Sequence, residues 1–204
     1  MRSQSRRMFF ADLVFNVWED VYEPAEDSFL IAGNLTVQKN DAILDMGCGC
    51  GILGIVAAKR QAKVTAIDIS PYAVRCSKEN AKLNHVAGNM FFLQGDLFEP
   101  LRSEAKFDSI VFNAPYLPVG RMKADSWLEF AWAGGATGRG VIDRFIDEAP
   151  SHLDTGGCIL LVQSNLSSVD ETLRRFEQND LRARIAAERA VPFFETLALV
   201  KADR

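Results

Sequence analysis

A glycine-rich turn between two apolar segments constrains the fold of this chain most. Residues 45–51 read Asp-Met-Gly-Cys-Gly-Cys-Gly; the strand-like segment 42–44 precedes them and the helix-like segment 52–59 follows. Glycines let the backbone bend sharply and approach a ligand closely. The order of strand, glycine turn and helix therefore predicts an open α/β sheet that binds a nucleotide-like ligand at the carboxyl end of the strand.

Two acids near this turn favour one class of ligand. The spacing Gly49-x-Gly51-x-x-Gly54 is also a weak dinucleotide fingerprint. Asp45, however, would repel a pyrophosphate and attract the ammonium and sulfonium groups of S-adenosylmethionine. Asp68 closes the next apolar run, where an acid commonly accepts hydrogen bonds from ribose hydroxyls. The pair favours S-adenosylmethionine over a dinucleotide, while the alternative that both acids only cap helices stays open.

Length and composition predict one α/β domain over residues 1–204. A hydrophobic content of 48% and a charged content of 25% are typical of a soluble globular protein. The formal charge of -4 argues against general attraction to nucleic acid. No apolar run approaches the roughly 20 residues that span a bilayer, and the N-terminus shows no signal-type core. We therefore expect a cytoplasmic protein without a membrane partner.

The cysteines and histidines do not form a metal-binding pattern. Cys48 and Cys50 lie in the glycine turn, Cys76 in a predicted helix and Cys158 in a predicted strand, and no CxxC pair occurs. The two histidines are remote from any cysteine cluster. We expect four reduced thiols and no bound metal.

The flanking segments carry weaker signals. Residues 1–20 fit either a strand or a helix, and residues 21–28 place acids and a proline before a short helix. We expect residues 1–40 to form a cap over the ligand. Ser70 and Pro71 predict a helix start, Ser168 to Glu171 read as a capping box, and residues 182–187 and 193–201 predict a terminal antiparallel strand pair.

The segment Asn113-Ala114-Pro115-Tyr116 follows a predicted strand at residues 107–112 and suggests a specific chemistry. An amide or exocyclic amino nitrogen is a poor nucleophile because its lone pair is delocalised. The Asn113 side-chain oxygen and the Ala114 carbonyl can accept its two N–H bonds, while the Tyr116 ring stacks on its plane. Pro115 stiffens the turn. We predict that this segment holds such a planar nitrogen group.

Two further segments complete the predicted site. Asp96 follows the third strand, residues 89–94, and its carboxylate can accept a bond from an adenine amino group. Residues 117–140 carry tryptophans and glycines with little periodicity. Because a connection of this length in a domain is usually functional, we predict a loop that binds the substrate.

The turn, the Asn113 segment and two further signatures resemble the HemK family of protein glutamine methyltransferases. Residues 21–28, and Ala131-Trp132-Ala133-Gly134-Gly135 with Gly138-Arg139, are similar to its archaeal and eukaryotic branch. The resemblance implies a Rossmann-like class I methyltransferase fold. Its seven-stranded, mostly parallel sheet would carry an antiparallel C-terminal strand and helices on both faces.

The resemblance also implies an activity and a set of site residues. The acceptor would be the glutamine of the Gly-Gly-Gln motif in a class 1 peptide chain release factor, and the donor S-adenosylmethionine. Asn113, Pro115 and Tyr116 would be the catalytic segment, with Ala114 and Trp132 also holding the acceptor. The expected donor contacts are Tyr22, Glu26, Asp45, Gly47, Gly49, Asp68, Ile69, Asp96, Leu97 and Asn113.

Ala114 departs from the family pattern, which has Asn-Pro-Pro-Tyr. The carbonyl is retained but the ring that restrains the turn is lost, so we expect weaker preorganisation with the chemistry intact. The family branch also works with a small zinc-containing activator subunit that pairs along the sheet edge. The third strand, here Met90-Phe91-Phe92-Leu93, carries no lysine or proline to blunt that edge.

Two alternative functions remain at this point. The same Asn-x-Pro-Tyr geometry serves nucleic-acid adenine N6-methyltransferases, which need base flipping and a basic cleft; the acidic balance opposes this reading. The second alternative is a non-catalytic module that only binds S-adenosylmethionine. In that case Ala114 would mark a catalytic site that has lost its function.

Overall fold

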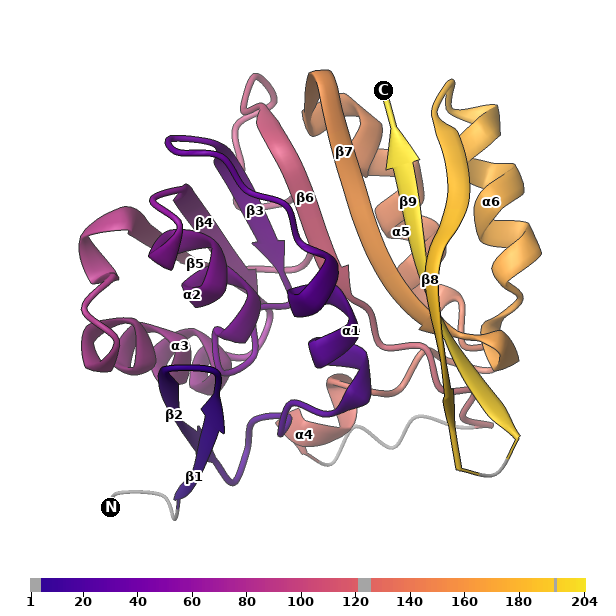
Figure 1. The fold of residues 1–204 in the computed structure, drawn as a ribbon. Helices are drawn as coiled ribbons and strands as arrows, with labels where there is room; N and C mark the ends of the chain where they lie inside the picture. Colours follow the sequence, from indigo (N-terminus) through magenta and orange to yellow (C-terminus); the bar gives the residue numbers. More distant parts are fainter. Residues whose placement is uncertain (1–4, 121–125, 193) are drawn as a thin grey trace.

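Seven strands form the central sheet of the protein, in the order β5-β4-β3-β6-β7-β9-β8 (Figure 1). The computed structural model describes residues 5–120, 126–192 and 194–204. Among the strands of the described residues, β9 alone runs opposite to the other six strands of this sheet. The strands are β3 (Ala42–Met46), β4 (Lys63–Asp68), β5 (Met90–Gln94), β6 (Phe107–Asn113), β7 (Leu153–Ser164), β8 (Arg182–Val191) and β9 (Glu195–Asp203). The predicted mostly parallel sheet with an antiparallel C-terminal strand is confirmed.

Helices cover both faces of this sheet because its strands are apolar on both sides. Along β6, Val111 belongs to one buried cluster and Ile110 and Phe112 to the other, as expected from the alternation of side chains in a strand. The first cluster is covered by α1 (Glu26–Asn34), α2 (Ile52–Lys59) and α3 (Pro71–Leu83), and the second by α5 (Gly140–Glu148) and α6 (Val169–Gln178). The short helical segments are α4 (Trp127–Phe130), η1 (Ala87–Asn89), η2 (Ala149–His152) and η3 (Asn165–Ser167).

The N-terminal segment forms a hairpin of β1 (Ser5–Phe10) and β2 (Leu13–Trp18), which resolves the open choice between strand and helix. Asn80 of α3 and Asn84, which directly follows this helix, bind the backbone of β2. Asn80 accepts from the Asn16 amide over 2.9 Å and donates to the Asn16 carbonyl over 3.0 Å, and Asn84 does the same for Val14. These side chains form hydrogen bonds with backbone amide and carbonyl groups on the outer edge of β2, and they attach the hairpin to α3.

Both predicted helices begin where expected, but only one of the two predicted N-terminal caps forms. The Ser70 hydroxyl accepts from the Ala73 amide at the start of α3, as predicted. Ser168 precedes α6 but has a left-handed backbone with φ of 56° and makes no side-chain capping bond. Its carbonyl instead accepts from buried Arg139 over 2.8 Å. The capping box fails because an N-cap side chain needs an extended backbone to reach the helix amides.

The connection that follows β6, predicted as a loop over residues 117–140, has local structure in its described part. It contains α4, and Leu117 pairs with Ala133 in an isolated bridge. The terminal strand pair is confirmed as β8 and β9, while Phe193 of the predicted range lies outside the described residues. Within the described ranges, no helix has both the length and the apolar character required to cross a membrane.

Candidate active site

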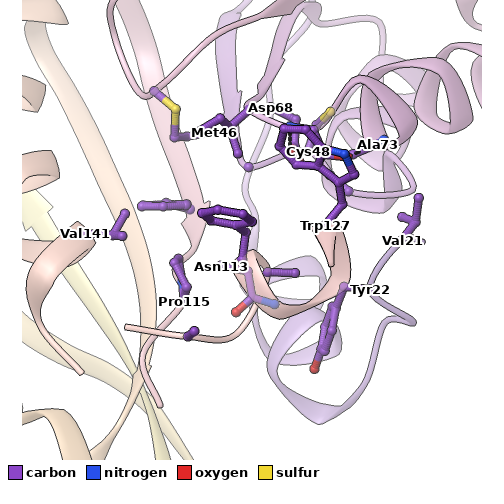
Figure 2. Close-up of a pocket in the computed structure, with 18 of the residues that line it drawn as sticks. Val21, Tyr22, Met46, Cys48, Asp68, Ala73, Asn113, Pro115, Trp127 and Val141 are labelled. Carbon is purple, nitrogen blue, oxygen red and sulfur yellow. Dashed lines mark hydrogen bonds between the residues drawn. The ribbon is translucent and has the colours of Figure 1, made fainter. Parts of the chain in front are cut away.

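A cavity of about 390 Å³ opens at the carboxyl ends of β3, β4 and β6 (Figure 2). A second cavity of about 400 Å³ adjoins it, and both share Asn113 and Tyr22. The first is lined by predicted donor contacts, which include Gly47, Gly49, Asp68, Ile69, Asp96 and Leu97. The second is lined by Tyr22, Asp27, Asn113, Ala114, Tyr116, Leu117, Ala131 and Trp132.

The glycine turn adopts a backbone that only glycine tolerates at its last position. Gly51 has φ of 90°, and a Cβ there would lie 2.4 Å from the Ser77 hydroxyl. A side chain would therefore strain the backbone and collide with α3. This close packing brings the turn against the first cavity.

Asp68 lies on the wall of the first cavity and holds the turn in place. One carboxylate oxygen accepts from the Gly49 amide and the other from the Ser70 amide, each over 2.9 Å. Burial raises the pKa of this carboxyl group above its ordinary value, and the two backbone bonds oppose that shift. Asp68 therefore links the turn after β3 to the end of β4.

Asp45 differs from the expectation of a direct contact with the donor. The residue is fully buried, and it is absent from the walls of both cavities. Its Oδ2 accepts from the Gly54 amide in the first turn of α2 over 2.8 Å, so the alternative of a helix-capping acid describes its visible role. Burial raises the pKa of Asp45 to about 7, and the nearby Asp68 charge adds to the shift.

Asp96 lines the first cavity as predicted, beside a cation that the sequence did not suggest. Its Oδ2 lies 2.8 Å from an Arg144 guanidinium nitrogen, and Arg144 lines the same cavity from α5. The pair is partly exposed to solvent. The carboxylate and guanidinium together give this end of the cavity both hydrogen-bond acceptors and donors.

Asn113 lies where the two cavities meet. Its Nδ2 donates to the Ser28 hydroxyl over 3.2 Å. Its Oδ1 is buried and has no hydrogen-bond partner among the described residues. A buried acceptor without a partner is unfavourable, and this one is available to an N–H donor that enters the site.

Asp27 is the site residue that the sequence analysis missed. It is buried with 4% of its surface exposed, and its Oδ2 accepts from the hydroxyls of Tyr22 over 2.8 Å and Tyr116 over 3.2 Å. Burial, and then the Asp27 charge, raise the pKa of both phenols above the ordinary range. The neighbouring predicted residue Glu26 is not brought into this group; its carboxylate lies 3.9 Å from Arg189 and is half exposed.

The remaining predicted residues also line these two cavities. Pro115 lines the first cavity, while Ala114 and Trp132 line the second. Trp132 reaches it because its carbonyl accepts from the Leu117 amide over 3.0 Å. Asp27 lies one residue after Glu26 in the first turn of α1, so its side chain points to a different face of that helix. That difference in direction is the sequence signal that could have indicated Asp27.

Comparisons with known proteins identify the family of this chain. The methyltransferase small domain family matches residues 24–185. A protein of Methanocaldococcus jannaschii, provisionally named a protein N5-glutamine methyltransferase, is 45% identical over 182 residues, which are 88% of this chain and 90% of the relative. This chain belongs to the HemK family of protein N5-glutamine methyltransferases.

Other members of the HemK family align over similar lengths. The human methyltransferase HEMK2 is 33% identical over 195 residues, 90% of each chain. The structure of the Encephalitozoon cuniculi Mtq2–Trm112 complex, described as responsible for methylation of the eRF1 translation termination factor, has a TM-score of 0.67 and 27% identity. It covers 91% of this chain and 99% of that one.

S-adenosylmethionine is the methyl donor of such enzymes, and the cavity fits it. A rigid turn of glycines, the Asp68 carboxylate and the Asp96 carboxylate line one continuous space. They provide the close backbone approach and the acceptors that a ribose and an adenine amino group require. The observation from this structure that favours an acceptor with N–H groups is the unpartnered Asn113 Oδ1.

Proposed function

We propose that this protein transfers the methyl group of S-adenosylmethionine to the side-chain amide nitrogen of a glutamine. The glutamine is that of the Gly-Gly-Gln motif in a class 1 peptide chain release factor. One observation carries the proposal: Asn113 presents a buried, unpartnered carbonyl oxygen at the junction of two cavities. The description of the Mtq2–Trm112 complex supports a release factor as the acceptor. The reaction would therefore act on translation termination in the cytoplasm.

We assign the donor to the first cavity. Asp68 would accept hydrogen bonds from the ribose hydroxyls and Asp96 from the adenine amino group, while Gly47 and Gly49 allow close approach. Additional expected contacts are Tyr22, Ile69 and Leu97. When bound, S-adenosylmethionine supplies an electrophilic methyl group on a sulfonium. Asp45, below the turn, would act on that cation through its charge alone, because it does not line the cavity.

We assign the acceptor glutamine to the second cavity. Asn113 Oδ1 and the Ala114 carbonyl would each accept one N–H bond of the glutamine amide, which increases electron density on its nitrogen. Pro115 would stiffen this turn, and the Tyr116 and Trp132 rings would restrain the planar group. The nitrogen becomes acidic once methylated and loses a proton to solvent, so the site needs no strong base.

The acceptor is tested directly with labelled S-adenosylmethionine. The purified protein is incubated with its organism's release factor, with a Gln→Ala variant of the Gly-Gly-Gln motif, and with total RNA, each with and without the activator subunit. We expect label on the wild-type release factor alone. Label on RNA would favour the adenine methyltransferase, and donor binding without any transfer would favour the non-catalytic module.

We also propose that β5 pairs with the small zinc-containing activator subunit. β5 is an outer strand of the sheet, and Phe91 on it is 66% exposed. An apolar edge strand without blunting residues is a site for strand addition, and the Mtq2–Trm112 complex shows that a similar protein assembles with a second protein. Phe91→Asp should abolish co-elution with the activator. Phe9→Asp, at an equally exposed position on β1, should not; equal co-elution of both variants would contradict the proposal.

A further inference from the structure

We propose that Ser28 is a positioning residue that determines which end of the Asn113 carboxamide faces the acceptor. Ser28 is buried with 3% of its surface exposed and lies between two site residues. Its hydroxyl is 3.2 Å from Asp27 Oδ1 and 3.2 Å from Asn113 Nδ2. The inference rests on the proposed function, because the orientation matters for an acceptor that brings N–H donors.

The direction of these hydrogen bonds begins at Asp27. A carboxylate can only accept, and four donors point at this one: the hydroxyls of Tyr22 and Tyr116, and the Ser28 amide and hydroxyl. The Ser28 hydroxyl therefore donates its proton in a hydrogen bond to Asp27 Oδ1. The same oxygen can then only accept from Asn113.

The Asn113 carboxamide has one orientation that satisfies this arrangement. Its NH2 end must face the Ser28 oxygen, which leaves Oδ1 at the opposite end, without a hydrogen-bond partner among the described residues. If the carboxamide were reversed, Oδ1 would lie against the Ser28 hydroxyl oxygen, whose proton already donates to Asp27. It would also aim its N–H groups at the N–H groups of a glutamine amide.

This arrangement predicts discrimination between an amide and a carboxylate in the acceptor. Asn113 Oδ1 accepts from the amide of glutamine but repels the oxygens of glutamate. Without the Ser28 hydroxyl, neither end of the carboxamide is held, and it can turn its NH2 end toward a carboxylate. Loss of the hydroxyl should therefore lower methyl transfer and weaken discrimination together.

The first test compares three variants as full chains with activator. Ser28→Ala should lower kcat about tenfold, the effect of one misdirected hydrogen bond, with unchanged S-adenosylmethionine affinity; Ser28→Thr should restore most of it. A release factor with Gly-Gly-Glu should inhibit Ser28→Ala about tenfold more strongly, relative to the Gln protein, than it inhibits wild type. Ser109→Ala removes another buried serine hydroxyl, on β6, and should change neither quantity. Unchanged kcat and unchanged discrimination in Ser28→Ala would overturn the inference.

A second test does not depend on the acceptor. The side-chain NH2 resonance of Asn113, assigned with Asn113→Ala, should show one proton protected from solvent exchange in the wild type and in Ser28→Thr. That protection should be lost in Ser28→Ala. Equal protection in all three proteins would contradict the role of Ser28 even if the release factor is not the substrate. Lack of methyl transfer by the wild type, with the protection pattern intact, would contradict only the proposed function.

Discussion

Asp27 and Tyr116 lie 89 positions apart in the chain, and the Tyr116 hydroxyl donates to Asp27 Oδ2 over 3.2 Å. The Tyr22 hydroxyl donates to the same oxygen over 2.8 Å. One buried carboxylate oxygen thus connects the segment before α1, the start of α1 and the turn after β6. This connection holds the wall of the acceptor cavity to the strand end that carries Asn113.

The shared oxygen predicts a non-additive effect of losing both tyrosine hydroxyls. Tyr22→Phe or Tyr116→Phe alone leaves one donor on Asp27 Oδ2 and should lower the free energy of unfolding by about 1 kcal/mol. The double variant leaves that oxygen without a described side-chain donor. Its free energy of unfolding should therefore fall by about 1 kcal/mol or more beyond the sum of the two single-variant effects. Urea unfolding of the four proteins measures the coupling, and strictly additive values would contradict the shared role.

Asn113→Ala should remove transfer without removing donor binding. The variant loses the buried Oδ1 that we assign to the acceptor amide. We expect kcat to fall by about 10²- to 10³-fold, comparable with loss of one preorganised polar group. Calorimetric titration with S-adenosylmethionine should give a Kd raised only a few-fold, because Asn113 is one of several expected donor contacts along the first cavity. Asn34→Ala, which removes an exposed asparagine of α1, is the matched control, and a parallel loss of donor binding in Asn113→Ala would disagree with this assignment.

Gly135 and Gly138, in the predicted substrate-binding loop at residues 117–140, form a matched pair for substitution. Both have a left-handed backbone, Gly135 with φ of 79° and Gly138 with φ of 73°. A Cβ at Gly138 would lie 2.3 Å from the Tyr116 carbonyl oxygen, whereas one at Gly135 meets no described atom within 4 Å. Gly135→Ala should therefore lower stability by about 1–2 kcal/mol from backbone strain alone. Gly138→Ala should lower it further and also displace the turn of Tyr116.

Thermal unfolding and single-turnover methylation distinguish these two variants. Gly135→Ala should retain transfer at a temperature well below its Tm. Gly138→Ala should lose transfer even where it remains folded. Equal activities of the two folded variants would show that the position of the Tyr116 turn does not matter for the reaction.

Asp45→Asn should change how stability depends on pH. Burial raises the pKa of Asp45 from 3.8 to about 7 in the folded protein. Between these values the folded state binds more protons than the unfolded state, so this group makes the free energy of unfolding fall as pH rises, until both states are ionised above about 7. Asparagine keeps an oxygen for the Gly54 amide but cannot ionise.

The variant should thus show a smaller decline across this window and be the more stable protein near pH 8, by up to about 4 kcal/mol. Asp68 shifts in the same direction, so some decline should remain. The measurement is denaturant unfolding without S-adenosylmethionine from about pH 4 to about pH 8. Parallel curves for the two proteins would show that Asp45 does not carry the effect.

Local sequence determined the sheet and the position of the donor cavity. Residues 45–51 bend sharply because of their glycines, and the apolar segments before and after them had to become a buried strand and helix. Asp68 and Asn113 end parallel strands and Asp96 follows one, so their meeting at one edge of the sheet was predictable.

Only the tertiary structure decided how the individual side chains are used. Asp45 lies near the end of β3 and Asp68 at the end of β4, yet the Asp45 side chain points under the turn to the Gly54 amide rather than into the cavity. Glu26 and Asp27 are adjacent acids of similar chemistry, and the rotation of about 100° between successive helix residues places Asp27 between two tyrosines and leaves Glu26 near the surface. Such choices depend on which side chain faces a partner from a distant segment, and strand and helix patterns contain no information about those partners.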